Sequence, residues 1–67
     1  RVEAQVGAGQ GATPVAVGDL VVADDQLAIG TAGKPLVKTG TPATHKYRVM
    51  NVKGTGLAGT TVVLELL

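Results

Sequence analysis

The chain has 67 residues, a formal net charge of +1, 45% apolar residues and no cysteine, phenylalanine or tryptophan. This length allows one domain, the missing cysteines exclude disulfides and thiolate metal sites, and a single histidine, His45, cannot build a zinc site by itself. No apolar run approaches the roughly 20 residues that span a bilayer, and no signal-peptide pattern is present.

The first segment, Arg1 to Pro14, is rich in glycine and differs in composition from the rest. Its composition is typical of a flexible tail, but Val2, Ala4 and Val6 would share one side of an extended chain. Such an arm could add itself as a strand to the sheet edge of a neighbour. We therefore assign residues 1–14 to an extended N-terminal arm and residues 15–67 to a small β domain. A chain that begins at Arg1 rather than at methionine also indicates a trimmed or partly ordered chain.

Short apolar runs separated by turn residues follow from Val15 to the end. Because Gly, Pro and Asp punctuate these runs and nothing long enough for a helix has a 3.6-residue period, the pattern predicts a small all-β sandwich or barrel of about five short strands. The predicted strands are Val15–Ala23, which contains a Gly-Asp break, then Leu27–Ile29, Leu36–Lys38, His45–Val52 and Thr60–Leu67.

The two longest predicted strands can be divided into faces, because alternate side chains point to opposite sides. In the last strand we expect Val62, Leu64 and Leu66 on the core face, and Thr61, Val63, Glu65 and Leu67 on the other. In the strand before it, the sets are Tyr47, Val49 and Asn51 against Lys46, Arg48, Met50 and Val52. An apolar edge strand aggregates unless it is paired or covered, so we expect the last strand to be covered in the working assembly.

Three motifs favour local structure over chemistry. Gly7, Gly9 and Gly11 loosely resemble a phosphate-binding loop, but a dinucleotide fingerprint needs a strand before it and a helix after it. Asp24 and Asp25 are predicted to form a turn, and the Asp that follows Gly18 is predicted to cap a bend. We expect no metal and no cofactor.

Reactive side chains do not form a recognisable catalytic set. His45 has no nucleophile partner at a recognisable spacing, and no nucleophile, base and orienting group can be assembled, so we do not expect an enzyme. Lys34 and Lys38 flank a hairpin-like segment, and the modified lysine of a lipoyl or biotinyl carrier domain lies at the tip of a hairpin. Their neighbours, Gly33-Lys34-Pro35 and Val37-Lys38-Thr39, do not match the sequences around such lysines.

The composition predicts a partner. Charged residues make up 16% of the chain, against about 25% in an average domain. A small domain without disulfides or metal is usually stabilised by oligomerisation or by docking on a larger body. The six basic residues are scattered and have almost no aromatic residues between them, which disfavours nucleic acid as the partner.

Four stretches between Val15 and Leu67 carry a resemblance: VAVGDLVV, GTAGKPLV, YRVMNV and LAGTTVVLELL. Together they resemble the small decoration, or cement, proteins of tailed-bacteriophage capsids. The resemblance implies a compact β fold on the outer surface of the virion, often as trimers at three-fold positions, that clamps neighbouring copies of the major capsid protein. A glycine-rich arm across capsid subunits would match residues 1–14.

From these features we expect a structural capsid protein that binds the major capsid protein and forms a homo-oligomer, with a trimer favoured. The expected contact residues are Val2, Ala4 and Val6 in the arm, Val63, Glu65 and Leu67 on the last strand, and Lys46 and Arg48 facing acidic groups of the shell. The alternative is an SH3-like or OB-like barrel that binds nucleic acid or a peptide, because VAVGDLVV is also similar to the opening of SH3-like ribosomal and co-chaperonin modules.

Overall fold

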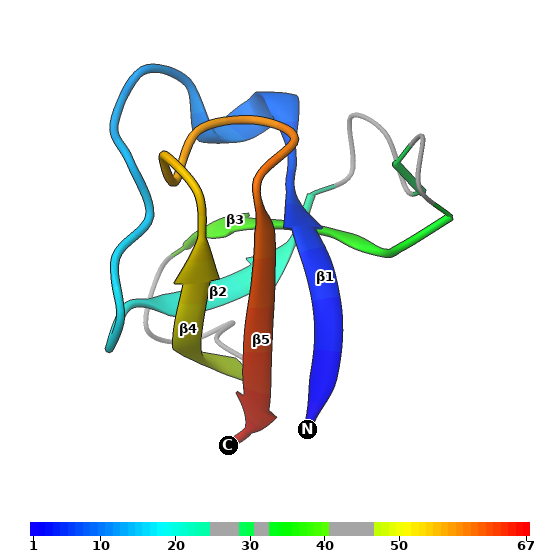
Figure 1. The fold of residues 1–67 in the computed structure, drawn as a ribbon, viewed down its shortest axis with the longest axis vertical. Coiled ribbons are helices and arrows are strands. Elements are labelled where there is room, and N and C mark those ends of the chain that lie inside the picture. Colours follow the sequence, from blue (N-terminus) through cyan, green and yellow to red (C-terminus); the bar gives the residue numbers. More distant parts are fainter. Residues whose placement is uncertain (25–28, 31–32, 41–46) are drawn as a thin grey trace.

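The computed structural model of the chain describes residues 1–24, 29–30, 33–40 and 47–67 (Figure 1). These residues form five strands, which close into a barrel in the order β1-β3-β2-β4-β5. The fold is therefore all-β, as predicted, and takes the barrel form of the two that the sequence left open. The elements are β1 (Val2–Val6), the short 3-10 helix η1 (Ala8–Gln10), β2 (Leu20–Ala23), β3 (Leu36–Thr39), β4 (Tyr47–Lys53) and β5 (Thr61–Leu66).

β1 closes the barrel. It pairs antiparallel with β5 and parallel with β3, while β2 pairs antiparallel with β3 and β4, and β4 antiparallel with β5. The apolar strand β5 is thus paired on both sides within the chain itself, by β4 and by β1 (Figure 1). The edge that we expected a partner to cover is covered by the first residues of the same chain.

The structure corrects the assignment of residues 1–14 to an arm outside the domain. In β1, Val2 lies opposite Leu64 and Ala4 opposite Val62, so the side that these residues share is the inner side of the barrel. Residues 7–14, which include η1, cross one end of the barrel as a loop (Figure 1). We had interpreted the alternation of Val2, Ala4 and Val6 as a strand that pairs with a neighbouring molecule. The segment pairs instead with β5 of its own chain, about sixty positions away.

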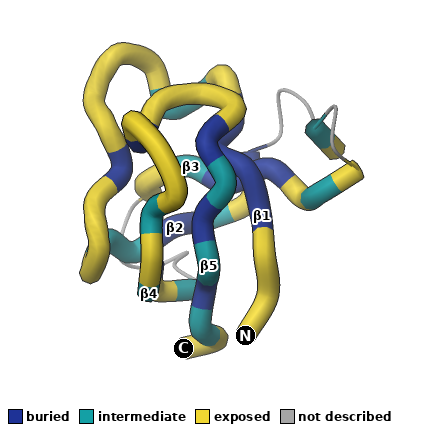
Figure 2. The backbone as a smooth tube through the Cα atoms, viewed as in Figure 1, coloured by how far each residue is buried: buried dark blue, intermediate teal, exposed yellow. Residues whose placement is uncertain are grey.

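The core consists of small aliphatic side chains, in a chain without phenylalanine or tryptophan. A five-stranded barrel has a narrow interior, which valine, alanine and single leucines can fill without large rings. Tyr47 and Val52 pack against it from partly buried positions. Most buried residues lie on the strands, and the loops are largely exposed apart from short stretches such as the one at Val15 (Figure 2). The core residues are Ala4, Val6, Val15, Val21, Val37, Val49, Val62 and Leu64.

A β-bulge in β4 changes the faces predicted for this strand. The register shifts between Val49 and Asn51, so that Val49 lies opposite Leu64, whereas Val52 lies opposite Val62. The extra residue places Val52 on the core side, where the simple alternation had placed Asn51. In β5, Val62 and Leu64 are buried as predicted, but Leu66 is 72% exposed at the end of the barrel.

The predicted cap by Asp19 is confirmed, whereas most of the residues of the other loop predictions lie outside the described part of the chain. Asp19 caps the bend before β2, because its Oδ2 atom accepts a hydrogen bond of 2.9 Å from the N–H of Ala16. Of the predicted strand Leu27–Ile29, only Ile29 is among the described residues, where it forms an isolated bridge with Pro35. Asp25, at the predicted turn, and His45, at the predicted strand start, lie outside the described residues.

Candidate functional site

The contact residues predicted in the first segment separate into two groups. Ala4 and Val6 are each 1% exposed and belong to the core, so they cannot contact a partner while the barrel is closed. Their prediction is corrected by the closure of the barrel through β1. Val2, at the start of β1, has the same orientation but lies at the end of the barrel where the chain begins, and it is 48% exposed.

The residues predicted on the last strand lie on the outer side of the barrel. Val63 is opposite Glu3 of β1 and Asn51 of β4, so this half-buried side chain lies in the middle of a polar row. Glu65 is opposite Arg48 of β4, which places opposite charges on neighbouring strands. The third predicted contact, Leu67, follows the strand and is 54% exposed.

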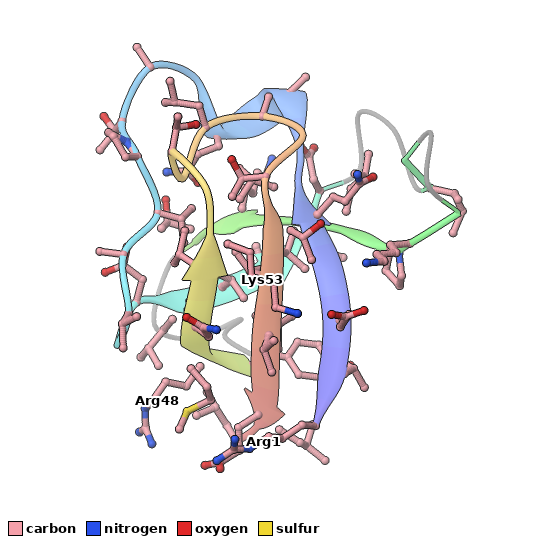
Figure 3. The ribbon with its side chains drawn as sticks, viewed as in Figure 1. Arg1, Arg48 and Lys53 are labelled. Carbon is pink, nitrogen blue, oxygen red and sulfur yellow. The ribbon has the colours of Figure 1, made fainter. Side chains whose placement is uncertain are left out.

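Of the two predicted basic contacts, Arg48 is described and exposed, and Lys46 lies outside the described residues. Arg48 lies opposite Leu20 of β2 as well as Glu65 of β5. Its side chain and that of Arg1 extend from the end of the barrel where both termini lie (Figure 3).

Three exposed apolar residues also lie at this end of the barrel, close to the two termini. We call Val2, Leu66 and Leu67 the terminal apolar patch; their exposed fractions are 48%, 72% and 54%. Because β1 and β5 are paired neighbours, the patch draws on two adjacent strands. The alternation with Leu64 had assigned Leu66 to the core. The structure shows that the buried core ends before Leu66 is reached along the strand.

An ion network ties three parts of the outer surface together. The Lys53 Nζ atom of β4 lies 2.9 Å from Glu3 Oε2, and the Lys34 Nζ atom lies 3.1 Å from Glu3 Oε1. Lys53 reaches across β5 to make this contact (Figure 3). Its hydrogen bond, followed by that from Lys34, lowers the pKa of the Glu3 carboxyl below its ordinary value of 4.5. Both lysines are therefore engaged with an acid of their own chain.

The glycine-rich loop packs against the buried side chain of Asp24. Asp24, just after β2, is 1% exposed, and its Oδ2 atom accepts a hydrogen bond of 2.7 Å from the N–H of Gly9. A Cβ atom on Gly7 would collide with the same carboxylate, and one on Gly9 would lie 2.8 Å from Asp24 Oδ1. These glycines are therefore required by an internal carboxylate, which occupies the place that the phosphate-loop pattern would give to a ligand.

The remaining lysine of the carrier-domain pattern lies within a strand. Lys38 belongs to β3, not to a hairpin tip, and its Nζ atom lies 4.0 Å from Asp24 Oδ1. Among the described residues, no group of three or more His, Cys, Asp or Glu side chains could hold a metal ion. In the same part of the chain, no helix is long and apolar enough to span a membrane.

Comparisons with protein-family models, with curated proteins and with solved structures found no match for this chain.

Proposed function

We propose that the chain is a non-enzymatic structural module that attaches to a larger protein assembly through the terminal apolar patch. The observation that supports this is the exposure of Leu66, at 72%, beside Leu67 and Val2 in a chain with few charges. Contiguous exposed apolar side chains are a frequent sign of a protein interaction surface. Arg1 and Arg48 at the same end would add charge complementarity with acidic groups of the partner (Figure 3).

The resemblance to capsid decoration proteins makes a tailed-bacteriophage shell the partner that we propose. The module would bind the major capsid protein on the outer surface of the virion, as a homo-oligomer with a trimer favoured. Many copies on a lattice would engage several weak contacts at once, so that a small patch on each copy would suffice. The arm that the resemblance implies is not needed for this mode of attachment, since β1 belongs to the barrel.

The test measures occupancy on shells that lack the protein, by co-sedimentation. Leu66→Ser should lower the affinity about tenfold or more, because truncating a residue at the centre of an interface costs about 2 kcal/mol when it is a hot spot, and about 1.4 kcal/mol is a factor of ten. The matched control is Val17→Ser, since Val17 is 64% exposed on the loop before β2. Thermal melting of both variants verifies folding. Equal occupancy of the two variants would contradict the patch, and no occupancy by the unchanged chain would contradict the shell as partner.

Removing residues 1–11, the obvious test of an arm, is not a clean experiment. It would delete β1 and with it two core residues, Ala4 and Val6. A loss of shell binding would then report unfolding. The substitution of Leu66 leaves the strand pairing of the barrel in place, because the change is confined to an exposed side chain.

The second candidate is a small barrel that binds nucleic acid or a peptide. Three of the six basic residues are engaged with acids, Lys34 and Lys53 with Glu3 and Lys38 with Asp24, which weakens the case for a phosphate backbone. Tyr47, the one aromatic residue, packs against the core and not on a stacking surface. A pocket where β1 ends favours a peptide as the ligand.

A further inference from the structure

A pocket of about 260 Å³ lies where β1 ends. Its apolar walls come from Val6 of β1, Ala8 of η1, Leu36 of β3 and Ala58 of the loop before β5. It lies toward the end of the barrel away from both termini, because Val2 begins β1 and Val6 ends it (Figure 1). The pocket and the terminal apolar patch are therefore separate sites.

Gln5 is the polar side chain of this pocket, and it is 7% exposed. Its Nε2 atom donates a hydrogen bond of 3.4 Å to the carbonyl oxygen of Gly59, which is a long contact. Its Oε1 atom accepts no hydrogen bond from the residues that the structure describes. A buried acceptor left without a donor costs about 1 to 3 kcal/mol, so this atom points to a donor from outside the chain.

Glycines shape the pocket around this carboxamide. A Cβ atom on Gly30 would collide with Gln5 Oε1 and would lie 3.0 Å from Leu36 Cδ2. Gly7 and Gly59 also line the pocket. Glycine allows another main chain to approach closely, which suits a peptide segment better than an isolated apolar molecule.

The size and charge of the pocket limit what it can bind. An apolar cavity of about 150 Å³ is enough to bind benzene, whereas pockets for drug-sized molecules begin at about 300 Å³. At about 260 Å³ the pocket is smaller than those of nucleotide cofactors and large enough for one side chain. Among the described residues, no charged side chain lines it, so it favours a neutral group with an apolar body and a hydrogen-bond donor.

We propose that this pocket binds one aliphatic side chain of a neutral, extended peptide segment from a partner protein, with a main-chain N–H of that segment donating to Gln5 Oε1. A leucine or valine residue offers both features within the reach of the pocket: a compact apolar side chain and an adjacent N–H. This peptide site does not depend on the terminal apolar patch, and either can fail without the other.

The first experiment is an NMR titration of the ¹⁵N-labelled chain with N-acetyl-leucinamide. A ligand of this size should bind with a Kd on the order of a few millimolar. Saturable shifts should be confined to the amides of Val6, Ala8, Leu36 and Ala58. An analogue whose amide nitrogens are all methylated lacks the donors and should bind at least fivefold more weakly. The α-amide of N-acetyl-aspartic acid, whose free side-chain carboxylate would place a charge in the pocket, should cause no saturable shift.

Two variants extend the test. Ala58→Leu fills the pocket from an exposed position and should abolish the shifts, while Ala12→Leu, at an exposed alanine outside the pocket, should leave them unchanged. Gln5→Met keeps the side-chain length but removes the acceptor, so the two leucine probes should then bind equally. The proposal is overturned if the unchanged chain gives no saturable shifts or if Ala58→Leu binds normally. Equal binding of both leucine probes to the unchanged chain would refute the role of Gln5.

Discussion

The carboxylate of Asp24 lies against the main chain of Gly9, with 2.7 Å between Asp24 Oδ2 and the Gly9 nitrogen. These residues are fifteen positions apart, one after β2 and the other in η1. The contact fixes the glycine-rich loop over the end of the barrel. A second contact has the same effect: Gln10 Oε1 accepts a hydrogen bond of 2.7 Å from the N–H of Thr39 at the end of β3.

Gly7→Ala should destabilise the barrel by about 1 to 3 kcal/mol, the range of overpacking in a tight interior. The φ of Gly7 is −86°, which alanine adopts without strain, so the cost arises from the collision of the new Cβ atom with the Asp24 carboxylate. Urea unfolding measures it. Asp24→Ala removes the two nearest atoms, Oδ2 and Cγ, and leaves only Cβ at 2.7 Å from the new atom. The double variant should therefore lose less stability than the sum of the single losses. Additive losses would contradict this account.

Asp24→Ala by itself should cost about 1 to 3 kcal/mol, because the Gly9 N–H loses its acceptor in a partly buried position. Asp24→Asn should cost less, since the amide oxygen can still accept this hydrogen bond. Asp19→Ala is the matched control, because its carboxylate caps an exposed turn. Denaturation midpoints rank the three variants. Asn and Ala variants of equal stability would show that the Gly9 hydrogen bond contributes little.

Glu3 should make the stability of the barrel depend on pH at the acid end. Its pKa is lowered in the folded chain, first by the hydrogen bond from Lys53 and then by that from Lys34. The stabilisation is therefore fully present above the ordinary value of 4.5, and it is lost as the pH falls through the lowered folded pKa. Glu3→Gln should flatten the stability curve over this interval.

The contributions of the two lysines can be separated by titrating the Glu3 carboxyl with NMR. Lys53→Met and Lys34→Met should each raise its pKa, because each lysine lowers it by a hydrogen bond, that of Lys53 being the largest cause, and by its charge. Salt should weaken both effects, since these side chains are partly exposed. A Glu3 carboxyl that titrates at its ordinary value in the unchanged chain would show that the network does not persist in solution.

Leu64→Ala and Leu66→Ala should differ strongly in stability, although the two residues are two positions apart on one strand. Leu64 is 1% exposed in the core, so its truncation should cost about 2 to 5 kcal/mol. Leu66 is 72% exposed, so its truncation should stay within about 0.5 kcal/mol. Thermal melting of both variants checks this. A large loss for Leu66→Ala would place that residue in a packed environment and would contradict the terminal apolar patch.

Most of the candidate site could not be predicted from the sequence, because exposure depends on where the barrel ends. Val2, Ala4 and Val6 alternate identically, but only Val2 is exposed. The alternation of Leu64 and Leu66 likewise does not show at which residue of the strand the buried core ends. Arg48, Val63, Glu65 and Leu67 lie on the outer side or at the end of the barrel, where contact with a partner remains a prediction.

The sequence by itself determined the all-β class, the absence of disulfides and a core of small aliphatic side chains, because alternation, turn residues and composition are local or additive properties. The tertiary structure decided that Val2–Val6 closes the barrel, that the bulge at Met50 turns Val52 inward, and that Gly7 and Gly9 accommodate Asp24. Each of these features depends on a pairing or a close approach between residues that are distant in the chain. The sequence could not predict them, because the local alternation of a strand is the same whichever strand it pairs with.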